Sequence, residues 1–253
     1  MKRLLLSALL TALAAPALAA SVADGRAHLD AGNYGAAVQT GRYVDSPEGT
    51  LLAAEAMGAQ IMLNRVDAVD TAKDALDMLD DVLDDDPDNT EALFLRALHQ
   101  GFRTRSSSKL AIVMGGLIGK TQDQIEAFAS AAPGDPRADA LRGAWHLGIV
   151  RAAGDGRFGA SLDEGLARYD AAVEALPEDI VVMSNYAFSL VVMEDEALRP
   201  RAKALLDQIA DTPARDAVSE DTKARMMRLR EVWGDEAEVR KRARSLLNTE
   251  EVE

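Results

Sequence analysis

The chain has 253 residues, of which 42 are acidic and 28 basic, so its formal net charge is −14. This excess of carboxylates excludes nucleic acid as a partner and argues against attachment to an anionic lipid surface, since both require cationic contacts. There are no cysteines, so disulfides and thiolate metal sites are excluded. Much of the 48% hydrophobic content is alanine and leucine, which favours helices over strands.

Residues 1–19 are predicted to be a secretory signal peptide. Lys2 and Arg3 form a short basic start, an apolar run follows from residue 4 to 15, and residues 17–19 (Ala-Leu-Ala) form an A-x-A cleavage site. The alternative, a membrane anchor, needs about 20 apolar residues and does not require the small-residue site. We expect cleavage after Ala19, a periplasmic location, and no stable membrane insertion after cleavage.

The clearest pattern is a predicted helix–turn–helix within residues 65–99. The first helix has apolar residues at steps of three and four: Ala72, Ala75, Leu76, Leu79, Val82 and Leu83. Pro87 ends this helix because proline cannot continue it. Asp88 or Asn89 can then cap the second helix. The apolar set of the second helix is Ala92, Leu93, Leu95 and Leu98.

This segment resembles a tetratricopeptide repeat (TPR), from the second helix of one unit through the Asp-Pro-x-Asn turn to the first helix of the next. The residues that match are Ala75, Val82, Pro87, Ala92, Leu93 and Ala97. Gly32 and Tyr34 resemble the turn inside an earlier unit. The resemblance implies an all-α fold, a right-handed α-solenoid of about five TPR-like helix pairs, in one domain over residues 20–253.

Prolines separate the predicted units at Pro47, Pro87, Pro136, Pro177 and Pro213. Their spacing exceeds the TPR period of about 34 residues, so the units are lengthened. After the first unit at 22–45, we expect helices near 48–64, 65–85, 89–100, 121–131, 136–152, from 161, 179–193, 200–210, 221–233 and 235–247. The helix at 121–131 is expected to begin at a capping box, Thr121-x-x-Gln124.

Residues 105–120 are expected to be an insertion. Their stretch KLAIVMGGLIG is too apolar for a solvated loop, so we expect it to lie against the concave surface. The candidate binding groove combines apolar residues of the third unit, the insertion and the fifth unit: Phe94, Leu98, Phe102, Met114, Leu117, Phe188 and Val191. The alternative is that these side chains are ordinary core.

No motif indicates catalysis, a cofactor or a metal. Residues 115–121 (GGLIGKT) lack the first glycine of a phosphate-binding loop, since position 114 is methionine. Residues 154–159 (GDGRFG) satisfy G-x-G-x-x-G, but no strand is predicted before them. The run Asp84-x-Asp86-x-Asp88 lacks the glycine and glutamate of a calcium loop. The three histidines are not at metal-ligand spacing, and no serine lies in a G-x-S-x-G elbow.

The predicted function is an exported, non-catalytic scaffold or adaptor that binds a protein partner through a helical-repeat groove. The alternative is a periplasmic protein that binds an apolar small ligand or assists a transporter, as the T component of some TRAP systems does. A closed apolar cavity would favour the small ligand, and an open groove would favour the protein partner.

Overall fold

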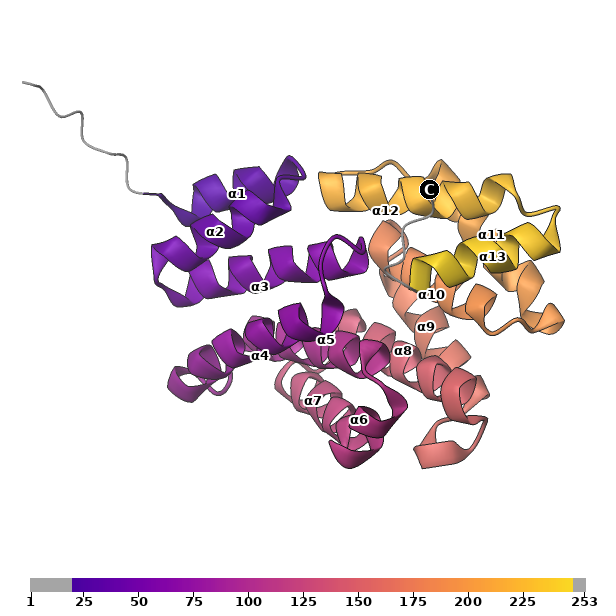
Figure 1. The fold of residues 1–253 in the computed structure, drawn as a ribbon, viewed down its shortest axis with the longest axis horizontal. Helices are drawn as coiled ribbons and strands as arrows, with labels where there is room; N and C mark the ends of the chain where they lie inside the picture. The colour runs from indigo at the N-terminus through magenta and orange to yellow at the C-terminus, as the bar shows by residue number, and fades with distance from the viewer. Residues whose placement is uncertain (1–19, 248–253) are drawn as a thin grey trace, which may run out of the picture.

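A computed structural model describes residues 20–247, and within that range the chain is all-helical, with no strand (Figure 1). The predicted signal peptide lies outside the described residues. The helices are α1 (Val22–Asp30), α2 (Tyr34–Val44), α3 (Pro47–Met62), α4 (Ala68–Asp85), α5 (Thr90–Ser106), α6 (Lys109–Met114), α7 (Leu117–Ala131), α8 (Pro136–Ala153), α9 (Leu162–Ala175), α10 (Ile180–Val192), α11 (Arg199–Asp211), α12 (Ala217–Glu231) and α13 (Glu236–Leu247). Short 3₁₀ turns precede α9 and α11 at Arg157–Gly159 and Glu196–Leu198.

Several helices begin at polar capping residues beside the prolines that separate the predicted units. Ser46 caps α3 and is followed by Pro47, whose missing N–H is not needed at the first helical position. The side chain of Asn89 accepts a hydrogen bond of 3.0 Å from the backbone N–H of Ala92 at the start of α5. Asp135, followed by Pro136, caps α8 in the same way. These local signals fixed most helix boundaries to within a few residues.

The segment 105–120, predicted to be an insertion, is mostly helical. Helix α5 continues to Ser106, and α6 follows after two residues. Gly116 has a left-handed backbone with φ of 60°, which separates α6 from α7. The predicted capping box at Thr121 is wrong, because α7 begins at Leu117. The hydroxyl of Thr121 donates instead to the Leu117 carbonyl inside that helix, at 2.8 Å.

Neighbouring helices cross closely where small residues allow it. An added Cβ at Gly41 of α2 would lie 2.5 Å from the carbonyl oxygen of Gly49 in α3. Between α8 and α9, an added Cβ at Gly143 would lie 2.6 Å from the Tyr169 ring. Ala75 is fully buried between α3, α4 and α5. We refer to these contacts between helices as the seams.

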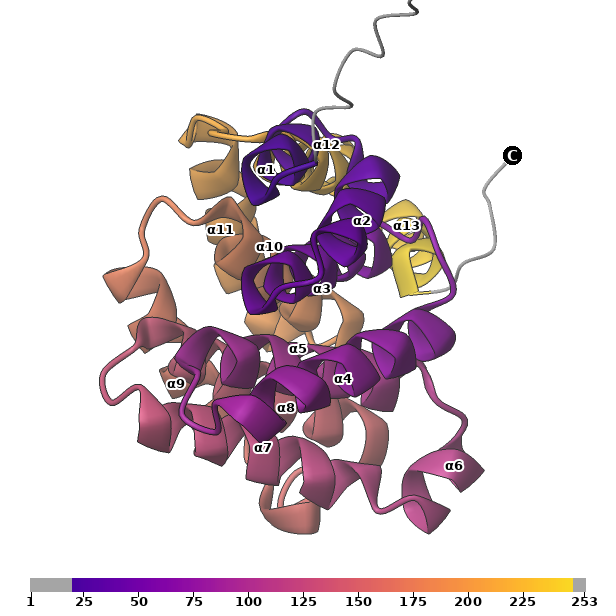
Figure 2. The ribbon, with the colours of Figure 1, turned by 90° about the vertical axis from the view of Figure 1, so that its left-hand side faces the viewer.

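The two ends of the described chain meet. Helix α1 contacts α12, and the Tyr34 hydroxyl lies 2.9 Å from a carboxylate oxygen of Asp221. Arg65 also binds Asp221, at 2.8 Å, and the side-chain amide of Asn64 donates to the Leu246 carbonyl at 3.0 Å. The end of α1 therefore lies next to the start of α12 (Figures 1 and 2).

Within residues 20–247, no helix combines the length and the apolar character that crossing a membrane requires.

Candidate functional site

A central cavity of about 930 Å³ lies inside this arrangement, lined by residues of α1, α3, α5, α8, α10 and α12, with smaller contributions from α6, α7 and α9. Most of its lining is apolar. Helix α5 contributes one face at helical spacing: Glu91, Phe94, Leu98, Phe102 and Arg105. The distance along the helix from the first to the last of these is about 21 Å, at 1.5 Å per residue. The cavity is therefore elongated along α5.

Helix α8 forms a second wall. Its cavity face has small residues, among them Ala140, Ala144 and Gly148, so the space in front of this helix is not filled from its own side. Nothing lies within 4 Å of a Cβ added at Gly148. Helix α10 adds Phe188 and Val192. The small residues of α8 thus leave room between aromatic residues of α5 and α10.

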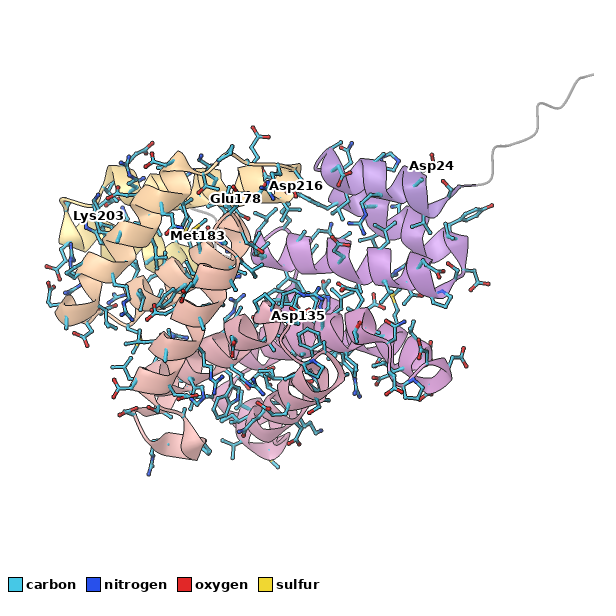
Figure 3. All side chains as sticks on the ribbon, turned by 180° about the vertical axis from the view of Figure 1, so that it is seen from behind. Asp24, Asp135, Glu178, Met183, Lys203 and Asp216 are labelled. Carbon is cyan, nitrogen blue, oxygen red and sulfur yellow. The ribbon has the colours of Figure 1, made fainter. Side chains whose placement is uncertain are left out.

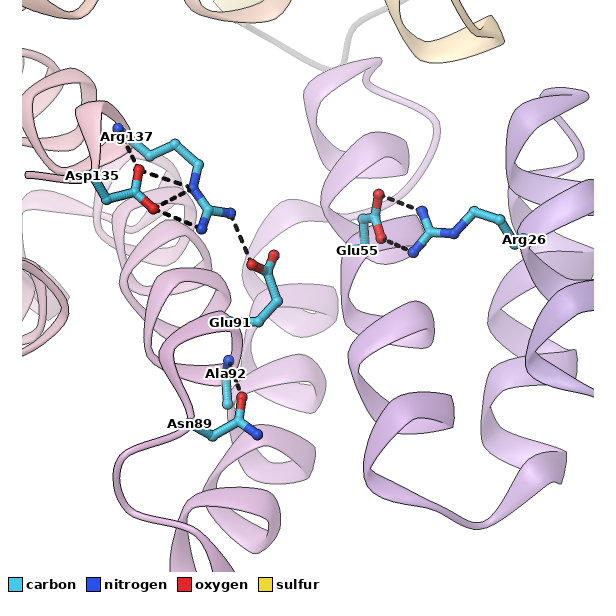
Figure 4. A network of polar contacts seen from close by, with 7 residues as sticks. All are labelled: Arg26, Glu55, Asn89, Glu91, Ala92, Asp135 and Arg137. Atoms are coloured by element: carbon cyan, nitrogen blue, oxygen red, sulfur yellow. Dashed lines mark hydrogen bonds and ion pairs between the residues drawn. The ribbon is translucent and has the colours of Figure 1, made fainter. Parts of the chain in front are cut away.

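The end of the cavity beside the starts of α5 and α8 carries ion pairs (Figure 4). Arg137 of α8 binds Glu91 of α5 at 2.8 Å and Asp135 at 2.9 Å, and its guanidinium lies 4.2 Å from the centre of the Phe94 ring. Arg26 binds Glu55 at 2.7 Å. We call this the paired end.

The charges at the paired end neutralise one another. Burial would raise the pKa of the Asp135 carboxyl, but its hydrogen bonds to Arg137 outweigh that effect and hold the pKa below its ordinary value. A third pair joins Arg215 and Glu178, and Glu178 and Asp216, labelled in Figure 3, also line the cavity. Each cavity-lining arginine named here has at least one carboxylate partner.

The opposite end of the cavity carries Arg105 of α5 and Arg151 of α8. Leu93 packs with Ala138 near the starts of α5 and α8, and Ala97 packs with Trp145 further along, so the two helices run in the same direction. Both arginines therefore lie near the carboxyl ends of these helices. Among residues 20–247, no carboxylate forms an ion pair with either arginine. We call this the cationic end.

The side chain of Arg105 faces the cavity and is exposed to that space. Its guanidinium lies 5.3 Å from the centre of the Phe102 ring. Burial lowers the pKa of Arg105, and the nearby charge of Arg151 lowers it further. The cationic end therefore brings two positive charges without a carboxylate of the protein to one part of the cavity wall.

Neutral polar groups also line the cavity. Burial raises the pKa of the Tyr169 phenol to about 12, so this cavity-lining group carries its proton at neutral pH. The hydroxyls of Thr104 and Thr121 lie 2.8 Å apart, and the Ser189 hydroxyl donates to the Asn185 carbonyl at 2.7 Å. All these residues line the cavity.

Four of the seven predicted groove residues line this cavity: Phe94, Leu98, Phe102 and Phe188. The other three do not. Met114 is 79% exposed on the outside of α6, and Leu117 is buried at the start of α7. Val191 packs against the core around α10 and α11. Ile112, Ile118 and Val192 line the cavity in their place.

The sequence analysis missed both arginines of the cationic end. Arg105 continues the spacing of Phe94, Leu98 and Phe102, and that spacing could have placed it on the same face. The polar residues around it were instead interpreted as the start of an insertion. Arg151 had no comparable signal, because the small residues before it on α8 give no apolar stripe.

The remaining sequence motifs do not form sites within the described residues. Residues 154–159 join α8 to α9, and no strand precedes them. His99 is fully buried, and a ring nitrogen donates to the Ala54 carbonyl at 2.9 Å. Across residues 20–247, no three histidine, aspartate or glutamate side chains are placed to hold a metal ion.

Fold and site together define a class: an all-α protein with a central, mostly apolar cavity that has one ion-paired end and one cationic end. Comparison with protein-family models finds none that matches the chain, and comparison with curated proteins finds no match either.

Proposed function

We propose that this protein is a non-catalytic binding protein that holds an apolar or amphipathic small molecule in its central cavity. One observation carries the proposal: a cavity of about 930 Å³ with mostly apolar walls, beside which α1 contacts α12. Cavities that bind small molecules commonly measure about 300–1,000 Å³.

The proposal includes a TPR-like right-handed α-solenoid that curves until its ends touch. Consecutive helices pack together, and the first members of successive pairs (α1, α3, α5, α8, α10 and α12) contribute most of the cavity lining. In a TPR-like array these are the helices that face the concave side. Counting α5 with α7 gives six pairs, one more than the sequence predicted.

The proposal also retains export to the periplasm, which rests on residues 1–19. A mature protein that begins at Ala20 is the expected result of an intact-mass measurement on natively exported material. Retention of Met1 to Ala19 would contradict it.

Helix α6 supports a second candidate, an adaptor that binds a protein partner. Leu110, Val113 and Met114 are 70%, 73% and 79% exposed on this short helix. Exposed apolar residues grouped in this way often mark an interaction site. Because Ile112 of the same helix lines the cavity, such a partner would dock beside the cavity wall.

The small-molecule proposal can be tested with an uncharged apolar dye, N-phenyl-1-naphthylamine, whose fluorescence rises in apolar surroundings. We expect saturable binding to the mature protein with one dye per chain. Gly148→Leu places a side chain in the cavity and should abolish the signal. Gly119→Leu is the matched control, since nothing lies within 4 Å of its added Cβ and it does not line the cavity.

Equal dye binding by the two variants would contradict a cavity site. Dye binding lost only when Leu110, Val113 and Met114 are replaced by serine would instead favour the outer surface of α6.

A further inference from the structure

We infer that the cationic end binds the anionic head of a long-chain monocarboxylate whose apolar tail lies along α5. This inference rests on the proposed function, since it names the class of ligand that the cavity would hold. Three features of the cavity point to this ligand: the distribution of charges within it, its length and its apolar lining.

The pairing of the cavity arginines differs between the two ends. Arg26, Arg137 and Arg215 each bind a carboxylate of the protein. Arg105 and Arg151 bind none among residues 20–247, although they lie in the same cavity. Both guanidinium groups face the cavity without a carboxylate of the protein, and a bound anion would neutralise their charge.

A third arginine, which does not line the cavity, lies close to this end, next to Met62, which packs against the cluster that contains Phe102. Arg225 of α12 donates a hydrogen bond to the Met62 carbonyl at the end of α3. Burial lowers the pKa of Arg225, and the charge of Arg105 lowers it further. Arginine guanidinium groups provide planar sets of donors that match a carboxylate, and Tyr169 adds a neutral hydroxyl nearby.

The rest of the cavity suits an apolar chain. From the cationic end toward the paired end, the α5 face presents Phe102, Leu98 and Phe94 over most of the helix length. Val192 and Phe188 lie on the α10 wall. Polar ligands with charges along their length would leave those charges unpaired against these walls. A ligand with a single anionic head and an apolar tail leaves no charge unpaired against these walls.

The helix macrodipole offers a simpler explanation for a basic residue near a helix end. It favours cations in the last turn of any helix, whichever face they occupy. It does not account for Arg105 and Arg151 facing the same cavity, where they repel each other. A solvent-facing position would give the same dipole energy without that repulsion.

The test compares dodecanoate with 1-dodecanol, which has the same chain and no charge, as competitors that displace N-phenyl-1-naphthylamine. The double variant Arg105→Gln/Arg151→Gln should need about tenfold more dodecanoate, since losing charged hydrogen bonds costs at least that factor. Its displacement by dodecanol should not change. Arg103→Gln is the control, because Arg103 lies on α5 but does not line the cavity.

Arg105→Lys/Arg151→Lys keeps the charge and should retain most of the dodecanoate affinity. If dye and dodecanol bind but the glutamine variants do not weaken dodecanoate, the inference is wrong while the proposed function stands. If neither dye nor competitor binds the wild-type protein, the proposed function fails as well. Melting curves confirm that each variant is folded before its binding is compared.

Discussion

The seams between helices and the wall of the cavity are built from the same residue types but behave differently. Helix α8 contains both. An added Cβ at Gly143 would lie 2.6 Å from Tyr169 of α9, whereas one at Gly148, five residues later, meets nothing within 4 Å. Gly143 lets two helices approach closely, and Gly148 keeps space open.

A similar contrast holds on α5. Ala92 and His99 are fully buried against neighbouring helices, while Phe94 and Leu98, although apolar, are only half-buried and face the cavity. The presence of a small or apolar residue on a helix such as α5 or α8 therefore does not show that the helix is closely packed there. What lies opposite the side chain determines whether it stabilises the fold or shapes a binding site.

The largest expected effect is at the seam between α3 and α5, where His99 is buried. Burial lowers the pKa of His99 from 6.5 to about 4. Between these values the unfolded chain takes up a proton that the folded protein excludes. Stability is therefore fully present above pH 6.5 and falls as the pH drops toward 4, by about 3 kcal/mol in total.

Urea denaturation at a series of pH values measures this effect. His99→Gln has no titrating ring and should lack this part of the pH dependence, although carboxylates with lowered pKa values, such as Glu126 and Asp135, will still contribute at lower pH. The same fall between pH 6.5 and 4 in the variant and the wild type would rule out a neutral buried His99.

The next largest effect on stability comes from adding the same volume at a seam and, in a second variant, on the cavity wall. Ala75→Leu forces a larger side chain into a filled contact and should cost about 1–3 kcal/mol. Ala144→Leu adds that volume on the cavity face of α8, where Ala144 is exposed, and should change stability by less than about 0.5 kcal/mol. If Ala75→Leu and Ala144→Leu lower the denaturation midpoint by the same amount, the cavity wall is packed as tightly as the seam.

The smallest effect is expected at the cavity glycines. Gly101→Ala and Gly148→Ala improve helix propensity and meet no neighbouring atoms, so each should stabilise the protein by up to about 1 kcal/mol. Gly143→Ala makes the same chemical change but forces a shift at the seam with α9, and should destabilise the protein. Thermal melting of the three variants gives the comparison, and a loss of stability at Gly148 would contradict the open space assigned there.

The sequence predicted the helices well because their signals are local. Pro47, Asn89 and Pro136 mark helix starts through backbone chemistry that does not depend on the rest of the fold. The exception is the segment around Thr121. There, Gly116 with its positive φ placed the helix start four residues before the capping pattern.

The site could be predicted only in part, because it depends on contacts between distant residues. Phe94, Leu98 and Phe102 were placed together by helical spacing alone. Tyr34 and Asp221 are separated by 187 positions, and no local pattern indicates that they meet and bring the chain ends together. Met114 was expected inside the groove, but the orientation of α6 turns it outward.

A crystal structure of the mature protein with dodecanoate tests the central claim most directly, because it shows where the ligand lies. We expect one dodecanoate in the central cavity, with its carboxylate within hydrogen-bond distance of Arg105 or Arg151 and its chain along Phe102 and Leu98. Dodecanoate bound only on the outer surface of α6, beside Val113 and Met114, would contradict the account.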